Sequence, residues 1–171
     1  AGVANPCYNI EEPKVPLILN EKRSFFKLYM GDTGLLCALS MDNIQFNILQ
    51  GDLSVNMGSI LENVMSQIFV SNGFSLHYFD KKKYGELDFV IQNGSTIDLI
   101  EIKSGNDYKK HATLDRVLNV AEWKTKDAIV FCKDNLFQEG GILYLPWYMA
   151  IFFKRKQLPE GFTFKVDLSG L

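Results

Sequence analysis

Two carboxylates and a lysine lie in two neighbouring segments that alternate between apolar and polar residues. The segments cover residues 86–92 and 96–103, and Asn93-Gly94 lies between them. Asn-Gly between alternating runs predicts a β-hairpin with a two-residue loop. In that register Glu101 is the diagonal neighbour of Asp88 on the same face of the sheet, about 7–8 Å away. The sequence therefore predicts two carboxylates close enough to share one metal ion.

Paired carboxylates repel each other and raise each other's pKa unless a cation lies between them. Mg²⁺ prefers a few carboxylates together with water, and Mn²⁺ is expected to suit the same ligands. Lys103 shares the face of Glu101 and could orient a metal-bound water or stabilise charge on a phosphate. Together these groups suit the hydrolysis of a phosphodiester. The alternative is an exposed Glu101–Lys103 ion pair, although Ile97 and Leu99 make the rest of that face apolar.

Glu62 is a third candidate carboxylate, on a helix predicted over 59–71. It falls at the edge of the apolar stripe of that helix, so it could lean toward the sheet. The alternative is a capping box, in which Ser59 caps the helix and Glu62 occupies the third helical position.

Three segments give the chain a resemblance to a known superfamily. Gly85-Glu86-Leu87-Asp88-Phe89-Val90 and Ile100-Glu101-Ile102-Lys103-Ser104-Gly105, preceded by Glu62 on a helix, resemble the PD-(D/E)XK nucleases. More narrowly, the chain resembles the domain of unknown function at the C-terminus of many prokaryotic AAA-type ATPases. Residues 26–36, FKLYMGDTGLL, resemble the motif that opens that domain, and the resemblance spans about 25 to 145.

The resemblance implies a restriction-endonuclease-like α/β fold, with a central mixed β-sheet flanked by helices. It assigns Asp88 and Glu101 to Mg²⁺ or Mn²⁺, Lys103 to the water or phosphate, and Glu62 to the outlying carboxylate. Leu87 stands where the superfamily pattern has proline. The implied activity is metal-dependent hydrolysis of DNA.

The resemblance also implies a P-loop ATPase module N-terminal to this domain in a longer protein. The chain contains no G-x-x-x-x-G-K-[ST] motif, so we expect no ATP site in it. The alternative function is a non-catalytic module that keeps the nuclease fold, binds DNA or protein, and regulates the ATPase.

Two lysine clusters flank the candidate site in sequence. Lys82 and Lys83 precede the Asp88 segment, and Lys109 and Lys110 follow the Glu101 segment. They could contact phosphates without reading bases. The alternative is that they serve only to keep loops solvated.

The surrounding elements predict a mixed α/β sheet flanked by helices. Pro6, Pro13 and Pro16 favour an extended linker over residues 1–24, with the domain over 25–171. We expect helices near 32–39, 43–50, 59–71, 110–123 and from Pro146 onward, and strands over 24–30, 75–80, 86–92, 96–103, 127–132 and 141–145.

Composition limits the classes of function. Apolar residues make up 47% of the 171 residues and charged residues 22%, which is typical of a folded protein. A net charge of −2 argues against binding polyanions through bulk charge. Three widely spaced cysteines and the lack of a secretory signal predict a cytoplasmic location, and no run is long enough to cross a membrane.

Overall fold

The structure, a computed structural model, describes residues 2–40, 57–123 and 127–156, together with 46, 49, 50 and 125. The helix predicted over 43–50 lies largely outside the described residues, as does the region beyond 156. None of the described helices is long and apolar enough to cross a membrane.

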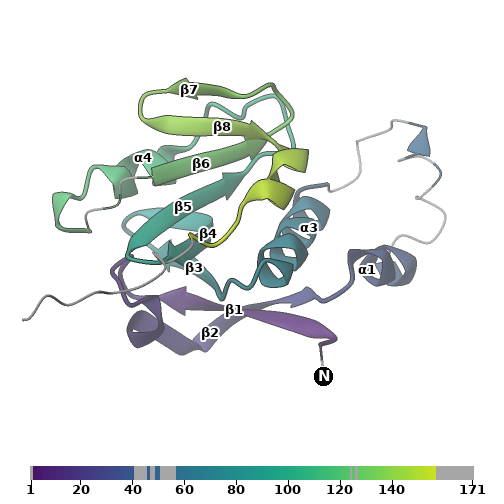
Figure 1. The fold of residues 1–171 in the computed structure, drawn as a ribbon, viewed down its shortest axis with the longest axis horizontal. Coiled ribbons are helices and arrows are strands. Elements are labelled where there is room, and N and C mark those ends of the chain that lie inside the picture. Colours follow the sequence, from purple (N-terminus) through teal and green to yellow (C-terminus); the bar gives the residue numbers. More distant parts are fainter. Residues whose placement is uncertain are drawn as a thin grey trace, which may run out of the picture.

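A mixed sheet of eight strands forms the centre of the molecule (Figure 1), in the order β2-β1-β3-β4-β5-β6-β8-β7. The β1–β3, β5–β6 and β6–β8 pairs are parallel, and the remaining pairs are antiparallel. The strands are β1 (Ala4–Ile10), β2 (Glu21–Met30), β3 (Leu76–Lys81), β4 (Gly85–Asn93), β5 (Thr96–Ile102), β6 (Asp127–Cys132), β7 (Phe137–Glu139) and β8 (Ile142–Pro146).

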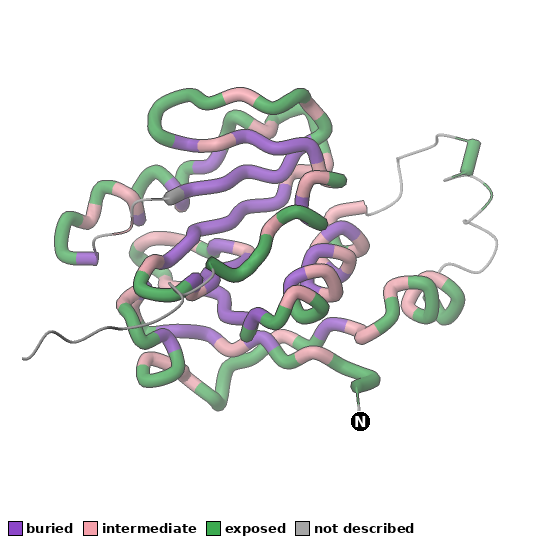
Figure 2. Tube along the Cα trace, viewed as in Figure 1, coloured by how far each residue is buried: buried purple, intermediate pink, exposed green. Residues whose placement is uncertain are grey.

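Helices cover both faces of this sheet, as the sequence predicts. The helical elements are η1 (Leu17–Asn20), α1 (Thr33–Ser40), α3 (Met57–Ser71), α4 (Ala112–Leu118), η2 (Ala121–Trp123) and η3 (Trp147–Phe152). Met65 and Phe69 of α3 pack on one face with Phe89, whereas Leu114 and Val117 of α4 pack in the apolar cluster on the other. Figure 2 shows the central strands buried and the edge strands β2 and β7 more exposed.

The first 24 residues do not form the extended linker that the prolines predict, because part of them is a strand of the sheet. Residues 4–10 form β1, an internal strand paired with both β2 and β3, and Cys7, Ile10 and Leu17 are fully buried. Pro6 is tolerated because the pairing with β3 begins one residue later, at Cys7. The N-terminal residues therefore belong to the sheet.

Other predicted elements differ mainly at their ends. The helix predicted over 110–123 divides into α4 and η2, and the last helix is a 3₁₀ helix that begins at Trp147. Asp32 caps α1, since its Oδ1 accepts a hydrogen bond from the Leu35 amide at 3.0 Å.

Candidate functional site

The hairpin of β4 and β5 places Asp88 and Glu101 at corresponding positions on neighbouring strands. Asn93 pairs with Thr96, so the loop is Gly94-Ser95 and the register differs by two residues from the prediction. A shift of two preserves the faces of a strand. The described pairing ends at Phe89 and Ile100, and Asp88 and Glu101 are the next residues of each strand. The two carboxylate residues are thus neighbours across the hairpin.

The backbone around Asp88 is irregular. Between the pairs of Val90 with His77 and of Leu87 with Phe79, the register of β4 against β3 shifts by one residue. Strand alternation therefore does not set the direction of the Asp88 side chain. Its Oδ2 accepts a hydrogen bond from the Ile102 amide at 2.7 Å, which holds the carboxylate beside the end of β5.

The pKa of Asp88 is raised from its ordinary value of 3.8 to about 7. Burial is the main cause, and the negative charges of Glu62 and Glu101 add to it. The hydrogen bond from Ile102 and the positive charge of Lys27 act in the opposite direction. A cation close to Asp88 would stabilise the ionised form of this buried carboxylate.

Glu101 lies at the end of the apolar face that it shares with Ile97 and Leu99, and it is only 7% exposed. Its Oε1 forms an ion pair with Lys103 Nζ at 2.5 Å. Its Oε2 is buried and has no hydrogen-bond partner among the described residues. The alternative of an exposed surface pair is therefore wrong for Glu101, whereas the Lys103 side chain keeps 28% exposure.

The backbone of Lys103 is fixed on both sides. Its amide donates to the Phe131 carbonyl at 2.9 Å, and its carbonyl accepts from Trp147 Nε1–H at 3.1 Å. Strand β6 and helix η3 thus fix the backbone at the end of β5. The Lys103 side chain therefore extends from a fixed backbone position.

Glu62 leans toward the sheet from α3. Its Oε2 accepts a hydrogen bond from the Tyr29 hydroxyl at 3.0 Å and lies 3.8 Å from Lys27 Nζ. The capping-box alternative is wrong, because α3 begins at Met57 and Ser59 lies inside the helix. Glu62 acts on Asp88 through its charge, but it forms no hydrogen bond or ion pair with Asp88, Glu101 or Lys103 in the described structure.

Lys27 and Tyr29 also contact Glu62 at the candidate site, although neither is among the site residues predicted from the sequence. Their β2 strand lies at the edge of the sheet, on the far side of β1 and β3 from β4. The available signal is their alternation in the segment Phe26-Lys27-Leu28-Tyr29, which places both on one face of a strand.

The metal-ligand potential of the site rests on two carboxylates. No group of three or more His, Cys, Asp or Glu side chains is positioned to hold a metal within the described part of the chain. Asp88 and Glu101 could bind a hard cation only with water or substrate oxygens as its other ligands. Mg²⁺ is usually bound in this way, and the unpartnered Oε2 of Glu101 fits that role.

The flanking lysines have different environments. Lys82 and Lys83 are exposed between β3 and β4, where Lys83 Nζ lies 5.0 Å from the centre of the Tyr84 ring. Lys109 forms an ion pair with Glu139 at 2.6 Å, and Lys110 pairs with Asp107 at 3.0 Å. Only the first pair of lysines lies beside β4 without an acidic partner among the described residues.

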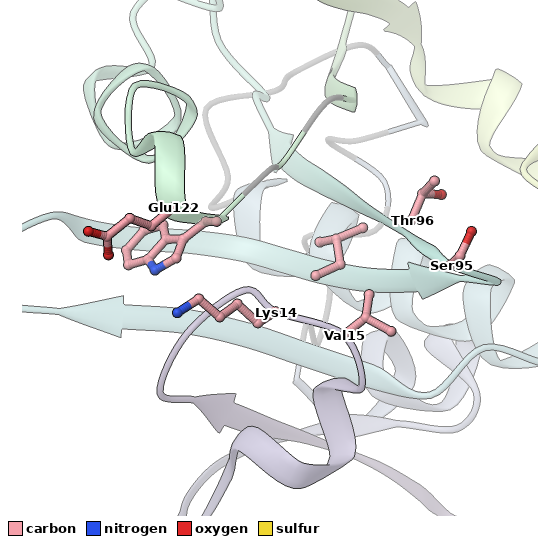
Figure 3. A pocket seen from close by; sticks show the side chains of 7 residues that line it. Lys14, Val15, Ser95, Thr96 and Glu122 are labelled. Atoms are coloured by element: carbon pink, nitrogen blue, oxygen red, sulfur yellow. The ribbon is translucent and has the colours of Figure 1, made fainter.

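A cavity of about 560 Å³ lies elsewhere, at the opposite end of β5 from Glu101. Lys14 and Val15, the start of β5 and Glu122 and Trp123 of η2 surround it (Figure 3). None of the candidate carboxylates lines this cavity. The candidate site at the end of β5 is therefore separate from this cavity.

Comparison with known proteins identifies a family for this chain. The model of a family described as a domain of unknown function (DUF4143) matches residues 57–149, more than half of the chain. No curated protein and no solved structure matches significantly. The matched region runs from α3 through β8 and contains Glu62, Asp88, Glu101 and Lys103, whereas β1 and β2 lie outside it.

Proposed function

The chain belongs to the DUF4143 family of domains of unknown function, and we propose that it is a metal-dependent, PD-(D/E)XK-like nuclease domain that hydrolyses DNA phosphodiesters. The observation that carries the proposal is the buried Oε2 of Glu101, which has no partner in the described structure. An unpartnered buried carboxylate oxygen is unfavourable. A cation shared with Asp88 would satisfy it.

Each residue has a distinct role in this proposal. Asp88 and Glu101 hold Mg²⁺ or Mn²⁺, which when bound activates water and neutralises charge on the phosphate. Lys103, paired with Glu101 but partly exposed, orients the water or the phosphate. Glu62 is the outlying carboxylate, and its charge strengthens the attraction of the site for a cation.

DNA would meet the site through phosphate contacts. Lys82 and Lys83 are the better placed pair, because they are exposed in the turn that leads into β4. Lys109 and Lys110 would first have to exchange Glu139 and Asp107 for a phosphate. We further propose that an N-terminal P-loop ATPase module in a longer protein controls access to this site.

A cleavage assay tests the proposal. Supercoiled plasmid, linear duplex, single-stranded DNA and RNA are incubated with the domain in Mg²⁺, Mn²⁺ or EDTA. We expect metal-dependent cleavage of DNA, reduced about 100-fold or more by Lys103→Met, since such groups contribute several kcal/mol to the transition state. Lys14→Met is the matched control, because Lys14 pairs with Glu12 and lies beside the cavity at the opposite end of β5 from Glu101. Metal-independent products, or equal cleavage by Lys103→Met, would contradict the assignment.

The second candidate is the non-catalytic regulatory module, and exposed apolar side chains favour it. Phe25, Phe26 and Leu28 of edge strand β2 and Leu35 and Leu39 of α1 are all exposed. Exposed apolar patches typically mark protein-binding surfaces. In this case Asp88→Asn leaves binding of the ATPase module unchanged, whereas the double substitution Phe26→Ser, Leu28→Ser abolishes it in size-exclusion chromatography.

A further inference from the structure

Lys27 contacts carboxylates on two elements that flank the candidate site. Its ammonium forms an ion pair with Glu86 of β4 and lies 3.8 Å from Glu62 Oε2 of α3. It also lies 5.0 Å from the centre of the Tyr78 ring, in cation–π geometry. The Lys27 side chain is only 27% exposed. This cation is therefore held from three sides.

Tertiary structure alone brings Lys27 to this position. Lys27 lies on β2 opposite Cys7 of β1, and both β1 and β3 separate it from β4 in the sheet. A partly buried ammonium is unfavourable unless carboxylates surround it. Here they do, since Glu86, Glu62 and Asp88 together outweigh burial and raise the pKa of Lys27. Lys27 is thus charged at neutral pH.

We propose that Lys27 is an internal counter-ion of Glu62 and Glu86 that opposes the binding of a divalent metal at the neighbouring Asp88 and Glu101. This inference rests on the proposed function and adds the regulation of its metal binding. The positive charge of the Lys27 ammonium reduces the negative potential of the site. A divalent cation is therefore attracted less strongly. It thereby sets the metal concentration at which the site fills.

Titration calorimetry with Mn²⁺ alone tests this opposing effect. Wild type is compared with Lys27→Met, which keeps most of the aliphatic stem, and with Lys27→Arg, which keeps the charge. Lys22→Met is the matched control, because Lys22 is on the same strand and pairs with Glu11. We expect Lys27→Met to bind Mn²⁺ about threefold or more tightly, given the effect of one charge near a solvated site. The Lys27→Arg and Lys22→Met variants should remain within about twofold of wild type.

Glu86→Gln provides a second test, which removes the ion-pair partner of Lys27 and leaves Lys27 itself in place. Glu86 is 47% exposed, so this substitution should not disturb folding. In Glu86→Gln, Lys27 loses one of its two carboxylate partners and keeps only Glu62. We expect Mn²⁺ to bind more weakly to this variant, because the positive charge of Lys27 is then less neutralised. In the double variant with Lys27→Met this weakening becomes smaller, because the two residues are coupled.

The outcomes separate the two proposals. If wild type binds Mn²⁺ and Lys27→Met binds no more tightly, the counter-ion role is wrong and the metal site stands. Equal weakening by Glu86→Gln with and without Lys27 also overturns that role. If neither wild type nor Lys27→Met binds Mn²⁺, the metal site and the counter-ion role are both wrong.

Discussion

Replacing Asp88 by asparagine should stabilise the protein, and the gain should depend on pH. The folded protein binds the Asp88 proton more tightly than the unfolded chain, because the pKa is raised from 3.8 to about 7. The resulting penalty is absent below about pH 3.8, grows as pH rises toward about 7, and is constant above. A difference of about three between the pKa values of the folded and unfolded states corresponds to a loss of at most about 4 kcal/mol in the free energy of unfolding.

Asparagine removes the charge and keeps an oxygen that can accept the hydrogen bond from the Ile102 amide. We therefore expect Asp88→Asn to exceed wild type in free energy of unfolding by about 2–4 kcal/mol at pH 8. At pH 5 the excess should be smaller by about 2 kcal/mol. Excess Mn²⁺ should close the gap by stabilising wild type alone, since only wild type retains both carboxylates.

Urea denaturation at pH 5, 6, 7 and 8 in EDTA measures this difference, with Asp107→Asn as the control. Asp107 is 78% exposed and pairs with Lys110, so its replacement should change stability by less than about 1 kcal/mol. A gain from Asp88→Asn that stays constant or falls between pH 5 and pH 8 would refute the reasoning about buried, like-charged carboxylates.

Three further substitutions test the framework of the site by urea denaturation at pH 8. Lys103→Met leaves Glu101 buried without its partner and should cost about 3 kcal/mol; the double variant with Glu101→Gln should recover most of it, and a cost below about 1 kcal/mol contradicts the ion pair's role. Gly85→Ala should cost about 2 kcal/mol or more, because φ is +103° and a Cβ would lie 2.3 Å from Thr113 Oγ1. If this variant is as stable as wild type, α4 can shift to accommodate the Cβ at no cost. Asn63→Ala should cost about 3 kcal/mol, since this 2%-exposed side chain bonds both backbone groups of Met30; a loss under about 1 kcal/mol would mean that water replaces these bonds.

The hairpin shows how local patterns predict this fold well. Alternation over 86–92 and 96–103 gives the correct strands and the correct face for Glu101, although the loop is Gly94-Ser95. Asn93 joins the strand because its side chain bonds the backbone of Lys154 and Lys156. That contact joins distant parts of the chain, and turn propensities do not include it.

Strand β1 shows where local patterns fail. Prolines in the first 24 residues predict a linker, but Pro6 lies at the end of β1 where pairing with β3 has not yet begun. The same long-range pairing brings Lys27 and Tyr29 of β2 to Glu62. Spacing within one segment predicts the hairpin carboxylates, whereas the cation opposite them depends on strand order across the sheet.

Mn²⁺ titration calorimetry shows whether Asp88 and Glu101 together hold a divalent cation. Wild type is compared with the double variant Asp88→Asn, Glu101→Gln, with urea denaturation confirming that both are folded. We expect saturable binding by wild type that the double variant loses. Equal binding by both proteins, or none by wild type at millimolar Mn²⁺, would contradict this expectation.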